Sequence, residues 1–161
     1  MKTVAYRPPN PDDLAFITSS WLKSNRNSDF ANFIDNKSYY KLHADLIKDI
    51  LTRSLVTIIC DIEAPDHIYG YAVYELLNNN LVLHYIYIKF NYRNFGLAKD
   101  CLTTIFPDFG TKDIHLTHID QVKTRIIEDG KDHLAKKTSC FIKKRDKYKL
   151  LYNPYLLVST R

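Results

Sequence analysis

The sequence is poor in the residues that build cross-linked domains and glycine-rich phosphate loops. Its 161 residues include three cysteines and four glycines. Cys60, Cys101 and Cys140 are odd in number and lie in apolar segments, so we expect buried thiols rather than a disulfide framework or a cysteine-rich zinc site. The four glycines cannot form G-x-G-x-x-G, and no G-x-x-x-x-G-K-[ST] segment is present. Rossmann dehydrogenases and P-loop nucleotide triphosphatases are therefore disfavoured.

Long hydrophobic runs are also missing. The sequence has no run of about 18 apolar residues that could cross a membrane, and residues 1–7 lack the apolar core of a signal peptide. We therefore expect a cytoplasmic protein without a membrane-spanning segment. The content of 45% hydrophobic and 13% aromatic residues suffices for one well-formed core, which predicts a single domain over residues 1–161.

The chain carries an excess of positive charge. Its formal net charge of +5 is compatible with an anionic cofactor, a nucleic acid or a host surface as partner. Basic residues are dense at Lys136–Lys137 and from Lys143 to Lys147. Such density is typical of a solvated turn, although it could also contact phosphates.

Hydrophobic periodicity and breaker residues predict a mixture of strands and helices. The strands are expected at residues 3–7, 55–62, 67–76, 81–88, 113–118, 139–144 and 148–158. Four helical segments are expected. The first begins near Pro11, the second and third span residues 39–53 and 95–106, and the fourth covers residues 120–138 and is interrupted by Gly130. The fold class is therefore α/β, of the α+β type, with a mixed, mostly antiparallel central sheet of about seven strands and flanking helices.

The segment between the fourth expected strand and the helix at 95–106 has the composition of an anion site. The exposed amides at a helix start attract anions, Gly96 and Ala98 are small enough for close backbone approach, and Arg93 adds positive charge. The alternative is that Gly96 only lets the helix pack closely on the sheet and that Arg93 is an ordinary surface charge.

The segment Arg93-Asn94-Phe95-Gly96-Leu97-Ala98 resembles the Gln/Arg-x-x-Gly-x-Gly/Ala motif of the GNAT superfamily of acyl-CoA N-acyltransferases. The order of expected strands and helices is similar to that of the family from about residue 3 to residue 158. The resemblance implies the GNAT-like fold, acetyl-CoA as the acyl donor, and transfer to an amine. It also implies a set of coenzyme-binding residues, namely Ile86, Ile88, Arg93, Asn94, Phe95, Gly96, Leu97, Ala98 and Lys99.

The resemblance implies that different residues of this set bind different parts of coenzyme A. The amides from Phe95 to Lys99 would hold the pyrophosphate of coenzyme A. The backbone groups of Ile86 and Ile88 would pair with the pantetheine as an additional strand does, and the amide of Ile86 would donate a hydrogen bond to the thioester oxygen.

His84 is the first candidate for the base that deprotonates the amine, because some family members place a proton-relay histidine at this distance before the motif and because its ordinary pKa suits proton transfer at neutral pH. A histidine packed in the sheet is the alternative. Glu75, on the preceding strand, is the second candidate. His115 and His118 do not form an obvious metal pair, so we assign no metal.

The sequence departs from the family pattern at the general acid. The family usually has a tyrosine four residues ahead of a Gly-Phe pair, whereas here Cys140-Phe141 takes the place of that pair and Lys136 the place of the tyrosine. Tyr148 or Tyr152 could protonate the thiolate instead, the thiolate could leave unassisted, or catalysis could have been lost.

The acceptor should contact the segment between the first two helices. The candidate residues there are Trp21, Arg26, Tyr39 and Tyr40, since arginine can recognise an anion and tyrosine can stack on a ring. These four residues do not determine whether the acceptor is a protein amine or a nucleic-acid base. A base is the acceptor in some phage enzymes with GNAT-like cores. The protein would act as a monomer or homodimer. The alternative function is a catalytically inactive GNAT-like scaffold that binds a protein partner or nucleic acid through its basic C-terminal region.

Overall fold

The computed structural model describes residues 3–28, 31–119, 123–128, 131–136 and 140–158. The helices are α1 (Asp13–Asn25), α2 (Asn36–Arg53), α3 (Leu97–Ile105) and α4 (Cys140–Tyr148), with short 3₁₀ turns η1 (Ala31–Phe33), η2 (Phe90–Tyr92) and η3 (Pro154–Leu157). The strands are β1 (Val4–Arg7), β2 (Leu55–Asp61), β3 (Ile68–Leu77), β4 (Asn80–Ile88), β5 (Ile114–Leu116), β6 (Lys123–Glu128), β7 (Lys131–Lys136) and β8 (Leu150–Tyr152). None of the described helices is both long and apolar enough to cross a membrane.

The central sheet has the strand order β1-β2-β3-β4-β5-β8. Neighbouring strands are antiparallel from β1 to β4, whereas β4 pairs with β5 and β5 with β8 in parallel. The predicted mixed, mostly antiparallel sheet is therefore confirmed. Six of the described strands form this sheet, where about seven were expected, and β6 and β7 form a separate two-stranded sheet.

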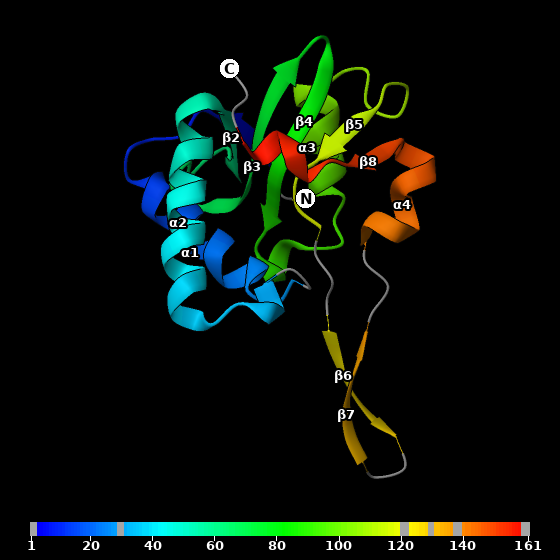
Figure 1. The fold of residues 1–161 in the computed structure, drawn as a ribbon. Helices are drawn as coiled ribbons and strands as arrows, with labels where there is room; N and C mark the ends of the chain where they lie inside the picture. The colour runs from blue at the N-terminus through cyan, green and yellow to red at the C-terminus, as the bar shows by residue number, and fades with distance from the viewer. Residues whose placement is uncertain (1–2, 29–30, 120–122, 129–130, 137–139, 159–161) are drawn as a thin grey trace.

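Helices α1 and α2 cover one face of the sheet and α3 covers the other (Figure 1), and a hydrophobic cluster lies on each face. One lies under α1 and α2 and includes Ile17, Trp21 and Ile47. The other lies under α3 and includes Leu97 and Cys101. The strands β2, β3 and β4 each contribute side chains to both clusters, so both faces of the central part of the sheet are covered.

The hairpin of β3 and β4 forms as the asparagine run predicts. Asn78 and Asn79 have φ angles of 50° and 62°, in the left-handed region that asparagine tolerates and that a tight hairpin turn requires. The pairing continues from Leu77 with Asn80 to Gly70 with Ile88. This hairpin fixes the position of Glu75 relative to the following strand.

The predictions for the C-terminal third were largely wrong. The described parts of the segment 120–138 form the hairpin of β6 and β7 rather than a helix, and β-branched Thr124, Ile126 and Ile127 favour that extended backbone. The strand expected at 139–144 is helical from Cys140 onward, because a short apolar run does not distinguish a strand from a helix start. The last expected strand is confirmed only over Leu150–Tyr152 and is followed by η3.

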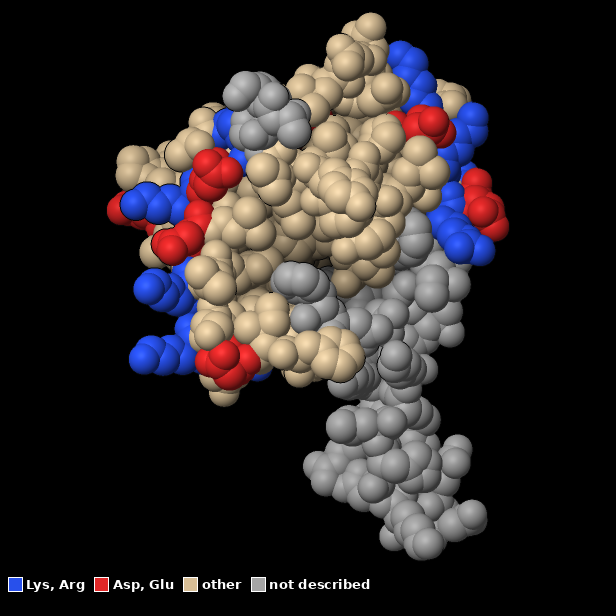
Figure 2. All heavy atoms as spheres, in the orientation of Figure 1, with Lys and Arg blue, Asp and Glu red and all other residues tan. Residues whose placement is uncertain are grey.

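Charged side chains gather at two margins of the face that carries β8 and η3. Figure 2 shows lysine and arginine over α2 at one margin and near α4 at the other, whereas the described residues in the middle of this face are uncharged. This middle region lies over the functional site described below.

Candidate functional site

The segment from Arg93 to Gly96 forms an exposed turn that leads into α3, which begins with the buried Leu97. Asn94 and Gly96 have positive φ angles of 67° and 79°, which glycine and a few polar residues adopt most readily. A Cβ atom at Gly96 would meet nothing closer than Asp100 Oδ2, at 3.9 Å, so the space in front of the turn is open. Because the first amides of a helix lack intrahelical partners, the start of α3 can attract an anion.

Arg93 links this turn to the end of β4. Its Nε donates a 2.8 Å hydrogen bond to the carbonyl of Ile88, and its guanidinium lies 6.0 Å from the ring centre of Tyr87 and 5.8 Å from that of Phe90. The positive charge of Arg93 is thereby held beside the start of α3.

The strand β4 extends beyond its partner β5. Their parallel pairing ends at Leu83 and Leu116, whereas β4 continues to Ile88. Among the residues that the structure describes, no strand pairs with the second half of β4 on this side. This half of β4 therefore has an open edge that can pair with an extended ligand.

The backbone groups of Ile86 and Ile88 face that open edge. Lys89, next in the chain, donates its amide to the carbonyl of Tyr69 in β3, at 2.8 Å. Hydrogen-bonded residues alternate along an antiparallel pair, so Ile86 and Ile88 direct their N–H and C=O groups away from β3. The structure thus brings together these two residues and the turn at Gly96.

A β-bulge at His84 changes the direction of the side chains along β4. Leu83 and Tyr85 lie opposite consecutive residues of β3, which leaves His84 as the extra residue. Sequence parity groups His84 with Ile86 and Ile88, but these two isoleucines pack on the α3 side. His84 instead points toward α2, on the same side as Tyr85.

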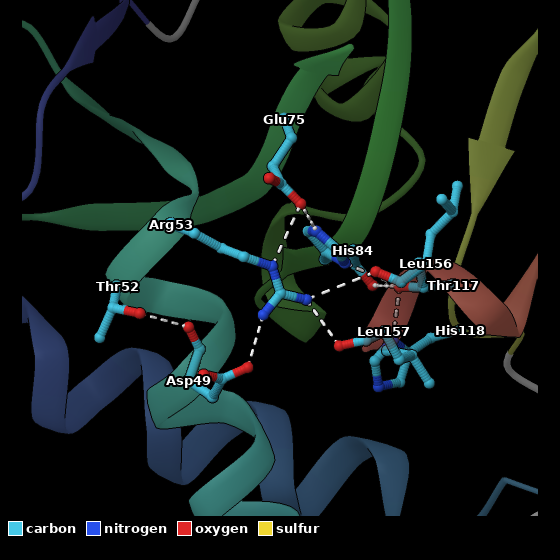
Figure 3. A network of polar contacts seen from close by, with 9 residues as sticks. All are labelled: Asp49, Thr52, Arg53, Glu75, His84, Thr117, His118, Leu156 and Leu157. Atoms are coloured by element: carbon cyan, nitrogen blue, oxygen red, sulfur yellow. Dashed lines mark hydrogen bonds and ion pairs between the residues drawn. The ribbon is translucent and has the colours of Figure 1, made fainter. Parts of the chain in front are cut away.

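Glu75 and His84 belong to a buried polar network (Figure 3). His84 Nε2 lies 2.7 Å from Glu75 Oε2, and Arg53 Nε lies 3.5 Å from the same oxygen. Arg53 also donates to Asp49 Oδ2 at 2.5 Å and to the carbonyl of Leu157 at 2.6 Å. The charge of the buried Glu75 carboxylate is therefore compensated by Arg53 at the end of α2.

The network continues through the other ring nitrogen of His84. Thr117 Oγ1 lies 3.1 Å from His84 Nδ1 and 3.0 Å from His118 Nδ1. His118 Nε2 lies 3.3 Å from His43 Nε2, and the side-chain amide nitrogen of Asn25 lies 3.2 Å from that same His43 atom. A continuous set of polar contacts thus runs from β3 across β4 and β5 to α2 and α1.

The direction of the hydrogen bonds follows from the Glu75 carboxylate, which can only accept. His84 then donates from Nε2, and its Nδ1 accepts from the Thr117 hydroxyl. Thr117 Oγ1 in turn accepts from Nδ1–H of His118, whose Nε2 accepts from Nε2–H of His43. These four contacts then each have one donor and one acceptor, whereas the Asn25 amide nitrogen, itself a donor, lies beside the same His43 atom without a hydrogen bond to it.

Burial keeps the three imidazoles uncharged. Desolvation lowers the pKa of His118 to about 3, and the neighbouring His43 and His84 act in the same direction. Desolvation lowers the pKa of His43 to about 4. It also lowers the pKa of His84, although the hydrogen bond to Glu75 opposes this shift. All three rings are therefore uncharged at neutral pH, and only at His84 does a neighbouring carboxylate, that of Glu75, favour uptake of a proton.

Two small cavities meet at His118. A cavity of about 70 Å³ is lined by Leu83, His84, Tyr85, Ile86 and His118. A second cavity, of about 110 Å³, is lined by Asn25, Ser28, His43, Leu46, Thr117, His118, Ile119, Tyr152, Pro154 and Leu157. The first adjoins the open edge of β4 and the second lies toward α1 and α2, so His118 separates two spaces that two reactants could occupy.

Three of the four predicted acceptor-binding residues pack around the histidines of the network. Trp21 is fully buried, stacks on Tyr85 with ring centres 4.7 Å apart, and meets His118 edge-on at 5.3 Å. Tyr39 is buried and stacks on His43 at 5.2 Å. Tyr40 is partly exposed and touches Tyr39 edge-on. Trp21 and Tyr39 thus fix two imidazole rings.

Arg26, the fourth of these residues, holds the connection between α1 and α2. Its guanidinium donates to the carbonyls of Ala31 and Ile34 and to the side chain of Asn36, and it lies over the ring of Tyr39 at 4.8 Å. All three of its nitrogens are therefore engaged within the protein.

The structure brings only one of the two predicted general-acid tyrosines to the site. Tyr152 pairs with Leu116 and lines the larger cavity. Tyr148 stacks on Phe109 and lies before Leu150, which pairs with Ile114 at the opposite end of β5.

The position given to Lys136 needs correction. Lys136 ends strand β7 rather than lying in the helix before the last strand. The residue that joins α4 to β8 is Lys149, with a φ of 52°.

Sequence reasoning missed the residues that complete the network, which are Asn25, His43, Arg53, Thr117 and His118. They come from α1, α2 and the end of β5, and no local motif relates them. No group of histidine, cysteine or carboxylate side chains suited to a metal ion occurs among the described residues.

Comparison with known proteins identifies the fold. No protein-family model matches the sequence, and no curated protein matches it either. Among solved structures, YycN of Bacillus subtilis, a candidate acetyltransferase, is 15% identical, with a TM-score of 0.56 over 71% of this chain and 80% of its own. NAA60 of Arabidopsis thaliana, in complex with a bisubstrate analogue, is 12% identical, with a TM-score of 0.50 over 83% of this chain and 94% of its own. The architecture of this protein is therefore the GNAT acetyltransferase fold.

Proposed function

We propose that the protein transfers an acetyl group from acetyl-CoA directly to the nitrogen of an amine, and that residues 1–161 form one catalytic domain. The observation that carries this proposal is the juxtaposition, within a GNAT fold, of the open edge of β4, the turn at Gly96 and the buried pair of Glu75 and His84. A helix start and an open strand edge fit an elongated anionic ligand, and the adjoining histidine fits proton transfer.

The coenzyme would bind on the α3 side of β4. The amides from Phe95 to Lys99 would hold its pyrophosphate, with Arg93 and Asn94 completing the turn. The pantetheine would lie along the open edge beside Ile86 and Ile88. Because the carbonyl of Ile88 already accepts from Arg93, Ile86 is the better placed of the two to offer both backbone groups.

Acetyl-CoA supplies a thioester whose carbonyl carbon is open to attack by an amine. The new bond forms between the amine nitrogen and that carbon, the carbon–sulfur bond breaks, and the nitrogen gives up a proton. The amide of Ile86 would stabilise the negative charge on the carbonyl oxygen. His84 would accept the proton, directly or through the Thr117 hydroxyl, while Glu75 stabilises the imidazolium that results.

Tyr152 is the proposed proton donor for the departing thiolate, because it lines the same cavity as His118 and Thr117. A coenzyme A thiolate is a fairly good leaving group, so such a donor accelerates the reaction without being essential. Tyr148 lies at the other end of β5 and is not assigned a role in the chemistry.

A calorimetric titration with acetyl-CoA tests the proposal. The wild type should bind in the micromolar range, and Gly96→Glu should abolish binding because it fills and charges the turn. Gly110→Glu is the matched control, since Gly110 also has a positive φ, of 90°, and a Cβ atom added there would meet no atom within 4 Å. It should bind as the wild type does. Equal binding by Gly96→Glu would refute the coenzyme site, and no binding by the wild type would favour the inactive scaffold.

A further inference from the structure

The larger cavity contains no charged side chain among the described residues that line it. Its polar groups are the imidazoles of His43 and His118, the Asn25 amide, and the hydroxyls of Ser28, Thr117 and Tyr152. The remaining wall is apolar, formed by Leu46, Ile119, Pro154 and Leu157. The chemistry of the cavity therefore suits a neutral ligand with hydrogen-bonding groups.

Among the residues that the structure describes, the charged side chains of the polar network and of the connection between α1 and α2 have partners within the protein. Glu75 is held by Arg53 and His84 and does not line the cavity. Arg53 also contacts Asp49, and Arg26 is bound within the connection between α1 and α2. The described residues in the middle of the face above the cavity are uncharged as well (Figure 2).

An alkylammonium ion in this cavity would lack a counter-charge among the described residues. Burying an unpaired cation costs several kcal/mol. The same cost acts on two side chains that line the cavity, because desolvation lowers the pKa of His118 to about 3 and that of His43 to about 4. The same environment that excludes an imidazolium should exclude an ammonium.

We propose that the acceptor is a weakly basic amine, uncharged at neutral pH, of the aromatic or heteroaromatic class, whose amino group enters the cavity beside His43, Thr117 and His118. This inference rests on the proposed function and narrows its acceptor. A neutral amine attacks without prior deprotonation, so His84, whose imidazolium the Glu75 carboxylate can stabilise, need accept only the proton released as the new nitrogen–carbon bond forms and the carbon–sulfur bond breaks.

The size of the cavity limits how much of the acceptor it encloses. At about 110 Å³ it is smaller than the roughly 150 Å³ cavity that encloses benzene. It therefore admits the amino group and the near edge of a ring. Tyr152, which is 47% exposed, forms the side of the cavity from which the rest of the acceptor would extend to the surface.

The test compares two isomeric amines, 4-methylaniline and benzylamine, at neutral pH. They have the same atoms, but the first is uncharged there and the second is an ammonium. Release of free thiol from acetyl-CoA is followed with each amine, and mass spectrometry identifies the product. We expect kcat/KM to be at least about tenfold higher for 4-methylaniline. Equal rates, or a preference for benzylamine, would overturn the inference.

The variant Asn25→Asp introduces a carboxylate beside His43 with little change in side-chain shape. It should lower the ratio of kcat/KM for 4-methylaniline to kcat/KM for benzylamine, or reverse the preference. Asn78→Asp, at the exposed hairpin turn, adds the same charge elsewhere and should leave the preference unchanged. An equal effect of both variants would contradict an assignment to this cavity.

Binding of the amines can be measured independently of acetyl transfer. Each amine is titrated into isotope-labelled protein if neither amine reacts, whether or not acetyl-CoA binds. Selective shifts of the His43 and His118 ring signals with 4-methylaniline would support the cavity assignment. No shift, or equal shifts with benzylamine, would overturn it. Failure of the acetyl-CoA titration alone refutes only the proposed function.

Discussion

The proposed sites on the two sides of β4 differ in the groups that form them and in their exposure to solvent. On the α3 side, the proposed coenzyme site consists mainly of backbone groups, lies at an exposed turn and has Arg93 beside it. On the α1 and α2 side, the proposed acceptor site consists of side chains, is buried and is uncharged among the described residues that line it. His84 lies at the bulge between the two sides.

This difference predicts opposite responses to mutation. Residues of the exposed turn make few contacts that stabilise the fold, so changes there should reduce ligand binding and leave stability nearly unchanged. Residues of the buried network compensate one another's charge and hydrogen bonds, so changes there should reduce stability first. The predictions below test this contrast in order of decreasing effect.

Glu75→Ala should have the largest effect on stability. It leaves Arg53 and His84 without their buried carboxylate, and breaking such a pair costs about 3–5 kcal/mol. Asp49→Ala removes the other carboxylate on Arg53, but the Asp49 side chain is 60% exposed and that of Glu75 is 6% exposed. The control should therefore cost less than about 1 kcal/mol. Urea unfolding measures both, and similar costs would contradict a network that depends on Glu75.

Acid should destabilise the fold through the histidines. In the unfolded chain His43 and His118 titrate near 6.5, whereas in the folded protein their pKa values are about 4 and about 3. The unfolded state therefore binds more protons below pH 6.5, and stability falls as the pH decreases toward the folded values. At about pH 5 each histidine should contribute a loss of about 2 kcal/mol.

Variants assign this acid effect to the buried rings. His43→Gln should make the decline of stability between about pH 6.5 and 5 shallower, whereas His67→Gln, at an exposed position, should leave its slope as in the wild type. The slope is obtained from urea unfolding at several pH values. An unchanged slope for His43→Gln would show that this ring is not buried in its neutral form.

Arg93→Ala should have the smallest effect on stability, within about 0.5 kcal/mol, because the residue is exposed. It should nevertheless weaken acetyl-CoA binding about tenfold, a loss typical of one charge-assisted contact. Arg93→Lys keeps the charge and should recover part of the affinity. If Arg93→Ala caused a large loss of stability and left the affinity for acetyl-CoA unchanged, the predicted difference between the two sides of β4 would be contradicted.

The α3 side could be predicted from sequence because its determinants are local. Gly96, Arg93 and the helix that follows lie within a few residues of one another, and the asparagine run fixes the preceding hairpin. These features identified the fold and the segment proposed to bind the coenzyme. The segment 120–144 was predicted poorly, because its short β-branched and apolar runs do not distinguish strand from helix.

The α1 and α2 side could be predicted only in part. Glu75 and His84 were selected one by one, but their contact depends on a bulge that sequence periodicity does not reveal. His43, Arg53 and His118 join them only because α2 packs across the sheet and β5 ends where it does. Such long-range packing has no signal within any short segment. Arg26 and Tyr39 were selected as acceptor contacts, which stays a prediction, and the sequence did not reveal that they also bind the connection between α1 and α2 and stack on His43.

A backbone NMR titration with coenzyme A would test the division between the two sides of β4 at single-residue detail. If the coenzyme binds on the α3 side, the largest shift changes should occur at the amides of Ile86 and of residues 95–99, with smaller changes at Asn25 and His43 across the sheet. Changes centred instead on α4 and its basic residues, or spread equally over both sides of β4, would contradict that division.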